Sequence, residues 1–215
     1  MSQLQTLAQA ICLDTHSSIR LAAEGLVIRV DPFRVPDAPH DADLIFVTHD
    51  HFDHYSPEDV EKVRKPDTVF VAPRSTAALI EKAFPGHACC AVGPDETGTV
   101  CGVRFETVRA YNPQKPFHPR ANNWVGYVLT LSGLRVYVAG DTDRTPEAEA
   151  VRCEIALVPI GGHYTMDPAE AAALVNAIRP QLAIPTHYGS VAGSPSCYGD
   201  FAARVDPAIR VEARL

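Results

Sequence analysis

The sequence predicts an α/β protein in which two mixed β-sheets pack together and helices cover their outer faces. Two stretches of the chain, residues 26–84 and 155–213, each alternate short apolar strands with helices. Residues 88–138, which join them, have mostly strand-like patterns and a hairpin turn. Two alternating halves linked by a hairpin-rich segment favour two sheets over one.

The first half begins with strands expected at Leu26–Val30 and at the apolar run Leu44–Thr48. Ser56 has the character of a helix N-cap, because Pro57 and two acidic residues follow it. This helix is expected to reach about Lys65. The remaining elements are a strand at Thr68–Ala72 and a helix at about Ser75–Phe84, followed by Gly86.

The clearest strands of the joining segment are Val103–Arg109, Val125–Leu131 and Leu134–Ala139, with Ser132-Gly133 as the turn between the last two. In the second half, Asp167 and Pro168 begin a helix that reaches about Arg179. The other elements expected there are strands at Ile155–Ile160, Leu182–Pro185 and Ile209–Ala213, and a helix near Asp200–Val205.

Composition narrows the function classes. The chain has 215 residues, 46% of them hydrophobic, and a formal net charge of −7. No basic run exceeds two residues, so nucleic acid is not an expected partner. No stretch approaches the roughly 18 apolar residues of a membrane span, and the N-terminus does not resemble a secretion signal. We therefore expect a cytoplasmic protein that acts on a small molecule, and a homo-oligomer is compatible with the sequence.

The most informative stretch is T-H-D-H-F-D-H at residues 48–54. It contains five potential metal ligands: His49, Asp50, His51, Asp53 and His54. In an extended or turning backbone His49 and His51 project to one side, whereas Asp53 and His54 follow as the chain turns into the helix at Pro57. Two pairs of side chains that point in different directions are better suited to bind two adjacent ions, about 3.5–4 Å apart, than one tetrahedral ion.

Further ligand candidates follow other apolar strands. His49, Asp141, His163 and His187 each come just after the end of a predicted strand, where functional groups gather in α/β sheets. The seven-residue turn needs a bridging carboxylate and more imidazoles, and Asp141, His118 and His187 are available at loop positions. The alternatives are a solvated histidine-rich loop, an exposed loop histidine at His118 and a turn aspartate at Asp141 that bonds its own backbone.

T-H-D-H-F-D-H resembles the H-x-H-x-D-H signature of the metallo-β-lactamase superfamily. The resemblance extends from the strand end I-R-V-D-P at Asp31 through A-G-D-T-D to P-T-H-Y-G. It looks most like the small stand-alone branch that includes L-ascorbate 6-phosphate lactonase-like hydrolases. This resemblance implies an αββα sandwich, a single domain over residues 1–215, and metals at one edge between the sheets.

The resemblance also implies the roles of the ligands. His49, His51 and His118 are similar to the ligands of a first metal, and Asp53, His54 and His187 to those of a second, with Asp141 as the bridge. His118 is placed by its position before the N-W-V-G-Y-V strand, since N-P-Q-K-P-F-H-P-R is not a standard signature. Flavin-linked di-iron relatives have Glu where this chain has His51, which disfavours redox chemistry.

The predicted activity is metal-dependent hydrolysis of a small, anionic ester, lactone or phosphodiester by a dinuclear metal-bound hydroxide. Zinc suits the imidazole-rich ligands, and manganese, iron or nickel are alternatives. We expect Asp53 or the bridging Asp141 to orient the hydroxide. His163 is the expected donor of the leaving-group proton, and Tyr164 and His16 are further donor candidates. His16, Lys115, Arg120 and Tyr164 are the expected substrate contacts. The alternatives are that His16 supports the ligands or is structural, and that Lys115 and Arg120 are plain surface charges. The competing classes are a non-catalytic metal-binding or sensing protein and a di-iron redox protein.

Overall fold

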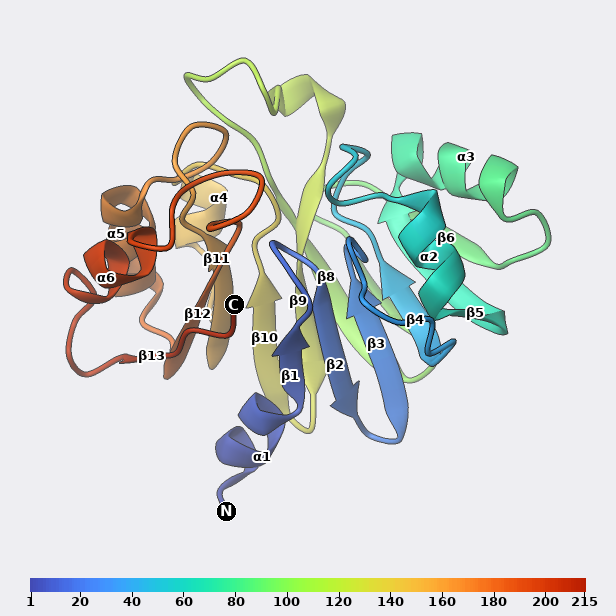
Figure 1. Ribbon diagram of the computed structural model, residues 1–215, viewed down its shortest axis with the longest axis horizontal. Helices are drawn as coiled ribbons and strands as arrows, with labels where there is room; N and C mark the ends of the chain where they lie inside the picture. The colour runs from blue at the N-terminus through green and yellow to red at the C-terminus, as the bar shows by residue number, and fades with distance from the viewer.

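The computed structural model describes all 215 residues and contains two mixed β-sheets with helices on their outer faces, as the sequence predicts (Figure 1). The first sheet has six strands in the order β1-β2-β3-β4-β5-β6. Its strands are Ile11–Leu13, Ile19–Ala23, Leu26–Val30, Ala42–Phe46, Arg64–Pro73 and Cys89–Val92. β3, β4, β5 and β6 run parallel, whereas β1 and β2 are antiparallel to their neighbours.

The second sheet has seven strands in the order β13-β12-β11-β10-β9-β8-β7. In chain order from β7 they are Thr97–Val100, Val103–Arg109, Val125–Leu131, Leu134–Val138, Ile155–Pro159, Leu182–Thr186 and Arg210–Val211. β10 to β13 are parallel, and β7 to β10 form antiparallel pairs. Each sheet is therefore parallel in the half that alternates with helices and antiparallel in its hairpins.

The helices lie in two groups on the outer faces. α2 (Pro57–Val63) and α3 (Arg74–Ala83) cover the first sheet, and α4 (Pro146–Glu149), α5 (Pro168–Ile178) and α6 (Cys197–Ala202) cover the second (Figure 1). α1 (Gln3–Gln9) lies near the N-terminus, and a 3₁₀ turn, η1, spans Arg120–Asn122. None of the helices combines the length and apolar character that a membrane span requires.

Three apolar clusters hold these layers together. The largest has 23 buried residues and lies between the sheets, where Phe46 of β4 meets Tyr127 of β9 with their ring centroids 5.0 Å apart. A second cluster joins α4, α5 and α6 to the outer face of the second sheet, and a third joins α2 and α3 to the first. Burial of apolar area in three layers is the dominant stabilising term.

Most elements lie where the sequence predicts them, and β3, β8 and β9 have the predicted bounds. Ser132 and Gly133 form the β9–β10 turn with φ of 50° and 73°, as a two-residue hairpin requires. The strand predicted at Leu44–Thr48 instead ends at Phe46, because Thr48 bonds the carboxylate of Asp31. The sequence did not indicate α1, β1, β2 or α4, which are short or lack a clear apolar period.

Asp59 in the first turn of α2 holds the loop that follows β3. Its carboxylate accepts hydrogen bonds from the backbone N–H groups of Arg34 at 2.8 Å and Val35 at 3.0 Å, and pairs with Lys62 at 2.8 Å. Burial alone would raise the pKa of Asp59, but the Lys62 ammonium and these hydrogen bonds outweigh it and lower the pKa below 3.8.

We expect Asp59→Ala to reduce the free energy of unfolding by about 2 kcal/mol or more, because the N–H groups of Arg34 and Val35 lose their acceptor and the second of these is buried. Because the folded pKa is the lower one, this stabilisation is complete above pH 3.8 and is lost as the pH falls through the folded pKa. Urea denaturation at pH 7 measures the loss, with Glu58→Ala, an exposed acid of the same helical turn, as the control. Equal midpoints for the two variants would contradict this role of Asp59.

Candidate metal centre

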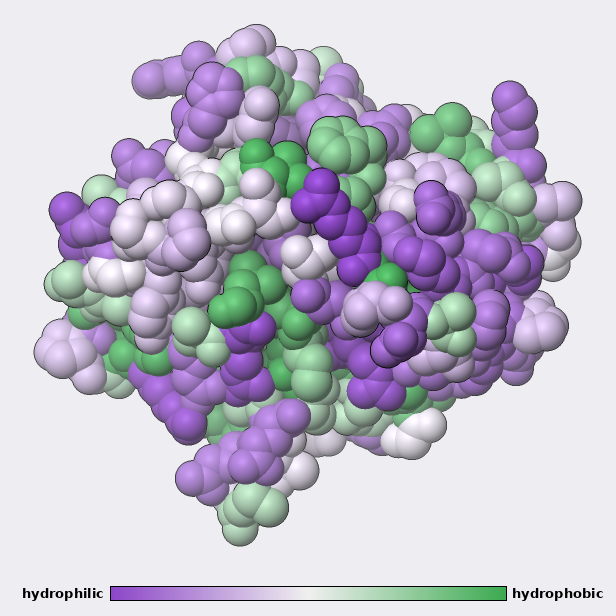
Figure 2. Space-filling view, viewed as in Figure 1, coloured by the Kyte–Doolittle hydropathy of each residue, from purple (hydrophilic) through white to green (hydrophobic).

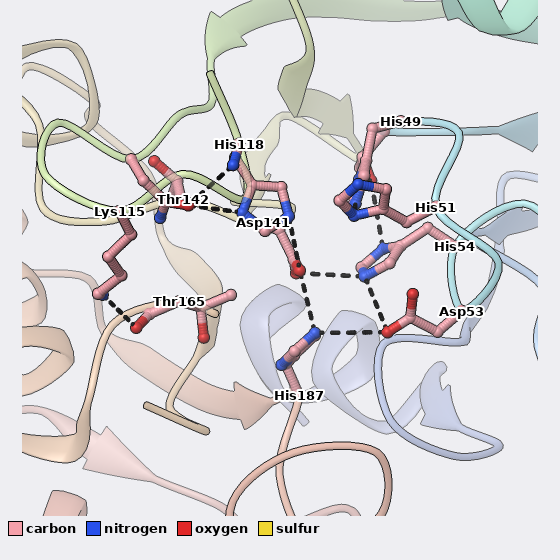
Figure 3. A network of polar contacts seen from close by, with 12 residues as sticks. His49, His51, Asp53, His54, Lys115, His118, Asp141, Thr142, Thr165 and His187 are labelled. Atoms are coloured by element: carbon pink, nitrogen blue, oxygen red, sulfur yellow. Dashed lines mark hydrogen bonds and ion pairs between the residues drawn. The ribbon is translucent and has the colours of Figure 1, made fainter. Parts of the chain in front are cut away.

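Four strands and one loop deliver polar residues to one edge of the sandwich, at the top of Figure 1. Asp31 follows β3, His49 follows β4, Asp141 follows β10 and His187 follows β12. The β8–β9 loop brings His118 to the same edge, because β9 runs antiparallel to β10 and begins there. This convergence produces the cluster of imidazoles and carboxylates in Figure 3.

His49, His51 and His118 form one group whose ring nitrogens could hold a single ion. His49 Nε2 and His51 Nδ1 are 3.2 Å apart. Two nitrogens bound tetrahedrally to one zinc at about 2.05 Å would lie about 3.3 Å apart. The spacing of these two nitrogens is therefore that of two ligands of one ion.

Asp53, His54 and His187 form a second group, and His16 belongs to it as well. Asp53 Oδ2 lies 3.7 Å from His187 Nε2, 4.0 Å from His54 Nε2 and 3.2 Å from His16 Nε2. The THDHFDH turn thus contributes its two pairs of ligands to two different groups.

Asp141 lies between the two groups (Figure 3). Its Oδ2 is 3.2 Å from His118 Nε2 and 3.0 Å from His187 Nε2, and its Oδ1 is 3.2 Å from His54 Nε2. One carboxylate therefore faces imidazoles of both groups, as a bridging ligand of two adjacent ions would. The structure brings together all seven residues that the sequence predicts as metal ligands.

Several of the donor atoms in the cluster also lack a hydrogen-bond partner, and a bound metal ion would coordinate them. Four of them are buried and have no hydrogen-bond partner: His54 Nε2, His118 Nε2, His187 Nε2 and Asp141 Oδ1. Buried polar atoms without partners are rare in native proteins and are expensive to maintain. Their convergence on one place fits bound cations and does not fit a purely structural hydrogen-bond network.

Three residues outside the predicted set orient the imidazoles. Asp31 Oδ2 lies 2.7 Å from His54 Nδ1, and Asn112 Oδ1 lies 2.7 Å from His118 Nδ1. The Thr48 hydroxyl donates to Asp31 at 2.6 Å and lies 3.0 Å from His49 Nδ1. Acceptors at Nδ1 keep the proton there and leave Nε2 free for a metal.

The sequence held only a weak signal for these three residues. Asp31 follows a predicted strand and Thr48 is the first residue of the motif, but nothing in the sequence marks Asn112. Trp124 was also missed: its ring centroid is 5.0 Å from that of His49, 4.8 Å from that of His51 and 5.7 Å from that of His118. The single tryptophan of the chain therefore packs against all three imidazoles of the first group.

Electrostatics differ between the two groups. Burial lowers the pKa of His49 well below 6.5, and the neighbouring His54 lowers it further, so His49 is neutral and ready to ligate. Burial alone would also lower the pKa of His54, but Asp141 and Asp31 outweigh it and raise this pKa well above 6.5. In return, although burial alone would raise the pKa of Asp141, His187 and His54 hold it well below its usual range. Cation binding at His54 must therefore displace a proton.

A cavity of 270 Å³ opens beside both groups. Its lining includes five members of the cluster together with Phe52, Phe117, Tyr164 and Val191. Of the predicted substrate contacts, Tyr164 therefore borders the cavity. The cavity gives the ligand cluster direct access to a small molecule.

Apart from Asp53, Asp141 and Tyr164, the predicted catalytic and substrate residues lie outside this lining. Lys115 Nζ bonds the Asp143 carboxylate at 2.5 Å. It also bonds the Thr165 carbonyl at 2.7 Å, as Figure 3 shows. Arg120 pairs with Glu147 at 3.1 Å. His163 is exposed, and its ring packs on Phe117 with the centroids 5.0 Å apart.

The end of β11, which precedes His163, packs closely against the backbone of the loop that carries His187. A Cβ on Gly161 would lie 2.1 Å from the carbonyl oxygen of His187, so only glycine allows the two strand ends to approach this closely. β11 thus supports the loop that carries His187, and the chain turns outward before His163.

His16, a predicted substrate contact, is fully buried and touches two ligands instead. Its Nε2 is 3.2 Å from Asp53 Oδ2, and its ring centroid is 3.8 Å from that of His187. We expect His16→Ala to weaken the second ion by about 10–100-fold, because Asp53 and His187 lose the group that orients them. The first ion should keep its affinity.

Competition against a chromophoric chelator measures the two affinities, with His40→Ala, an exposed histidine, as the control. Equal weakening of both ions in the His16 variant would show a general loss of structure. Unchanged binding of both would contradict the role of His16.

Comparison with known proteins places this architecture in a family. The model of the beta-lactamase superfamily domain matches residues 10–187. A UPF0173 metal-dependent hydrolase of Aeropyrum pernix is 35% identical over 209 residues, which cover 86% of this chain and 83% of that protein.

Comparison with solved structures supports the same family assignment. The crystal structure of a protein described as a metal-dependent hydrolase of Parabacteroides distasonis has a TM-score of 0.83 and 32% identity, covering 95% of this chain and 91% of that one. Igni18, a metallo hydrolase of Ignicoccus hospitalis, shares the fold with a TM-score of 0.73 and 21% identity, covering 94% of this chain and 93% of that one. The chain therefore belongs to the beta-lactamase superfamily and, within it, to the metal-dependent hydrolases.

Proposed function

We propose that this protein hydrolyses a small ester, lactone or phosphodiester at a centre of two divalent ions. The observation that carries the proposal is the position of Asp141, whose two oxygens face imidazoles of both ligand groups within 3.2 Å. A structural site closes on about four ligands, whereas seven ligands beside a cavity favour catalysis over a non-catalytic or sensing role.

His49, His51 and His118 would hold the first ion, Asp53, His54 and His187 the second, and Asp141 both. When bound, such a pair lowers the pKa of a shared water from 15.7 towards about 7 and stabilises negative charge that develops on the substrate. Zinc is the first candidate because the ligands are mostly imidazoles, and manganese, iron and nickel follow.

The protein's own groups supply the rest of the reaction. Asp53, on the cavity lining, is placed to orient the attacking water. Tyr164 borders the same cavity, so its hydroxyl is better placed than the exposed His163 to give the leaving group a proton. Lys115 and Arg120 already have carboxylate partners, so they lend no support to the anionic substrate that the sequence suggested. Cytoplasmic location and oligomeric state remain predictions.

Removal and return of metal tests the proposal. Protein stripped by a chelator should lose hydrolysis of aryl esters, lactones or bis(4-nitrophenyl) phosphate and recover it with two equivalents of zinc or manganese. Failure to hydrolyse any of the three classes, by protein shown to hold two ions, would contradict the proposal. A visible absorption band from bound iron in the purified protein would favour the redox alternative.

A further inference from the structure

The cavity beside the ligand cluster has two chemically different halves. One half consists of His51, Asp53, His118, Asp141 and His187. The other half consists of Phe52, Phe117, Tyr164 and Val191, which we call the apolar wall. The Tyr164 hydroxyl is the only side-chain hydrogen-bonding group that the apolar wall contains.

No lysine or arginine lines the cavity. The nearby cations are engaged elsewhere: Lys115 pairs with Asp143, and Arg120 pairs with Glu147. Arg34 lies over the Phe33 ring, 5.0 Å from its centroid, and donates to the Ser190 hydroxyl. Recognition of a phosphate or carboxylate on a substrate usually requires a free guanidinium or ammonium, and the apolar wall provides neither.

The aromatic side chains of the apolar wall are set up for contact. Phe117 packs edge-on against Tyr164 with the centroids 4.7 Å apart, which fixes both rings. Phe52 meets Phe33 edge-on at 5.9 Å but keeps 66% of its surface exposed. Apolar side chains emerge at the upper edge of Figure 2, where Figure 1 places the loops that carry the cluster, and others lie in the centre of the same face.

We propose that the cavity selects small, uncharged acyl compounds, such as an ester or lactone with an aromatic or branched apolar group, and selects against phosphodiesters and acids. This inference rests on the proposed hydrolase function and narrows its substrate class. A volume of 270 Å³ limits the ligand to a small molecule. Burial of an apolar group against two phenylalanines provides the affinity, at roughly 25 cal/mol for each Å² removed from water.

The ligand cluster itself cannot supply this selectivity. Two divalent cations held by two carboxylates would leave the reacting end positive for every substrate, so anionic and neutral compounds would both be attracted there. The difference must come from the apolar wall, where an anion would lose water without gaining a partner.

Hydroxamic acids test the apolar wall without turnover, because the same metal-chelating group can be attached to different substituents. Calorimetry with protein holding two zinc ions should show benzohydroxamic acid binding about tenfold more tightly than acetohydroxamic acid. Its 4-carboxy derivative should bind about tenfold more weakly than benzohydroxamic acid itself. No gain from the phenyl group, or tighter binding of the carboxy derivative, would overturn the inference.

Substitutions in the apolar wall show which residues cause the preference for the phenyl group. Phe52→Ala and Phe117→Ala should each lose most of the gain from the phenyl group, whereas Leu79→Ala, which removes an exposed apolar side chain of α3, should not. Val191→Lys should strengthen binding of the carboxy derivative, and Val191→Met, of similar length but neutral, should not. Equal effects of the Lys and Met variants would contradict the inference.

Turnover separates this inference from the function on which it rests. We expect 4-nitrophenyl butyrate to be hydrolysed with a higher kcat/KM than bis(4-nitrophenyl) phosphate, which has the same leaving group. A preference for the phosphodiester would leave the hydrolase standing and overturn the substrate class. Absence of both hydroxamate binding and hydrolysis, in protein shown to hold two ions, would overturn the hydrolase function itself.

Discussion

Asp141→Asn should abolish tight binding of both ions and reduce hydrolysis on the order of 10³-fold or more. The substitution keeps the size of the side chain but removes the negative charge that two cations share. It also replaces one acceptor oxygen by an N–H₂ donor, which cannot ligate a metal. The imidazoles that now face Asp141 Oδ2, from His118 at 3.2 Å and His187 at 3.0 Å, would lose their common partner.

Asp143 in the same loop provides a matched control, because it pairs with Lys115 and lies outside the ligand groups. Asp143→Asn should cost stability yet keep both ions. Metal affinity of the two variants, measured by titration and read by the emission of Trp124, distinguishes them. Retention of two ions at parental affinity in Asp141→Asn would show that Asp141 does not bridge them.

The second large effect is expected at Asp31, a residue that touches no substrate. Asp31 is buried and accepts hydrogen bonds from the Thr48 backbone N–H at 2.8 Å and the Thr48 hydroxyl at 2.6 Å. It also holds His54 Nδ1 at 2.7 Å. Carboxylate, histidine and metal in such a line are a common arrangement, in which the outer partner fixes the ring and strengthens the ligand.

Asp31→Asn should weaken the second ion by about 10–100-fold and also lower the free energy of unfolding by about 1–3 kcal/mol. Asparagine tolerates the left-handed backbone at this position, where φ is 49°, so the effect reports the lost charge. Metal titration and urea denaturation measure the two effects. If the first ion weakened and the second did not, the coupling of Asp31 to His54 would be refuted.

Secondary-structure elements were predicted correctly where the local sequence pattern is strong. The N-cap and proline of α2 and α5 and the Ser132-Gly133 turn each mark a boundary by side-chain or backbone chemistry. α1, β1 and β2 were not predicted, although Ser2 and Gln5 form a capping box at the start of α1. Thr48 left its predicted strand because a long-range bond to Asp31 outweighs its β propensity.

The gathering of the seven predicted ligands could be foreseen because strand ends and one dense motif carry them. The residues that surround these ligands could not be predicted, because their roles depend on contacts between residues that are distant in the sequence. Asn112 matters only through the close approach of its Oδ1 to His118, and Lys115 is withdrawn from the cavity only by Asp143 and Thr165. His16 appeared to be a substrate contact in the sequence, whereas tertiary packing buries it behind Asp53.

The most direct test of the central claim is the metal content per chain. Plasma mass spectrometry would be applied to protein purified without chelator or affinity-tag nickel, beside a His118→Ala variant. Two ions per chain in the parent and about one in His118→Ala are expected, because the variant removes one ligand of the first group alone. One ion or fewer in the parent, unchanged in the variant and not increased by added zinc or manganese, would contradict the two-ion centre.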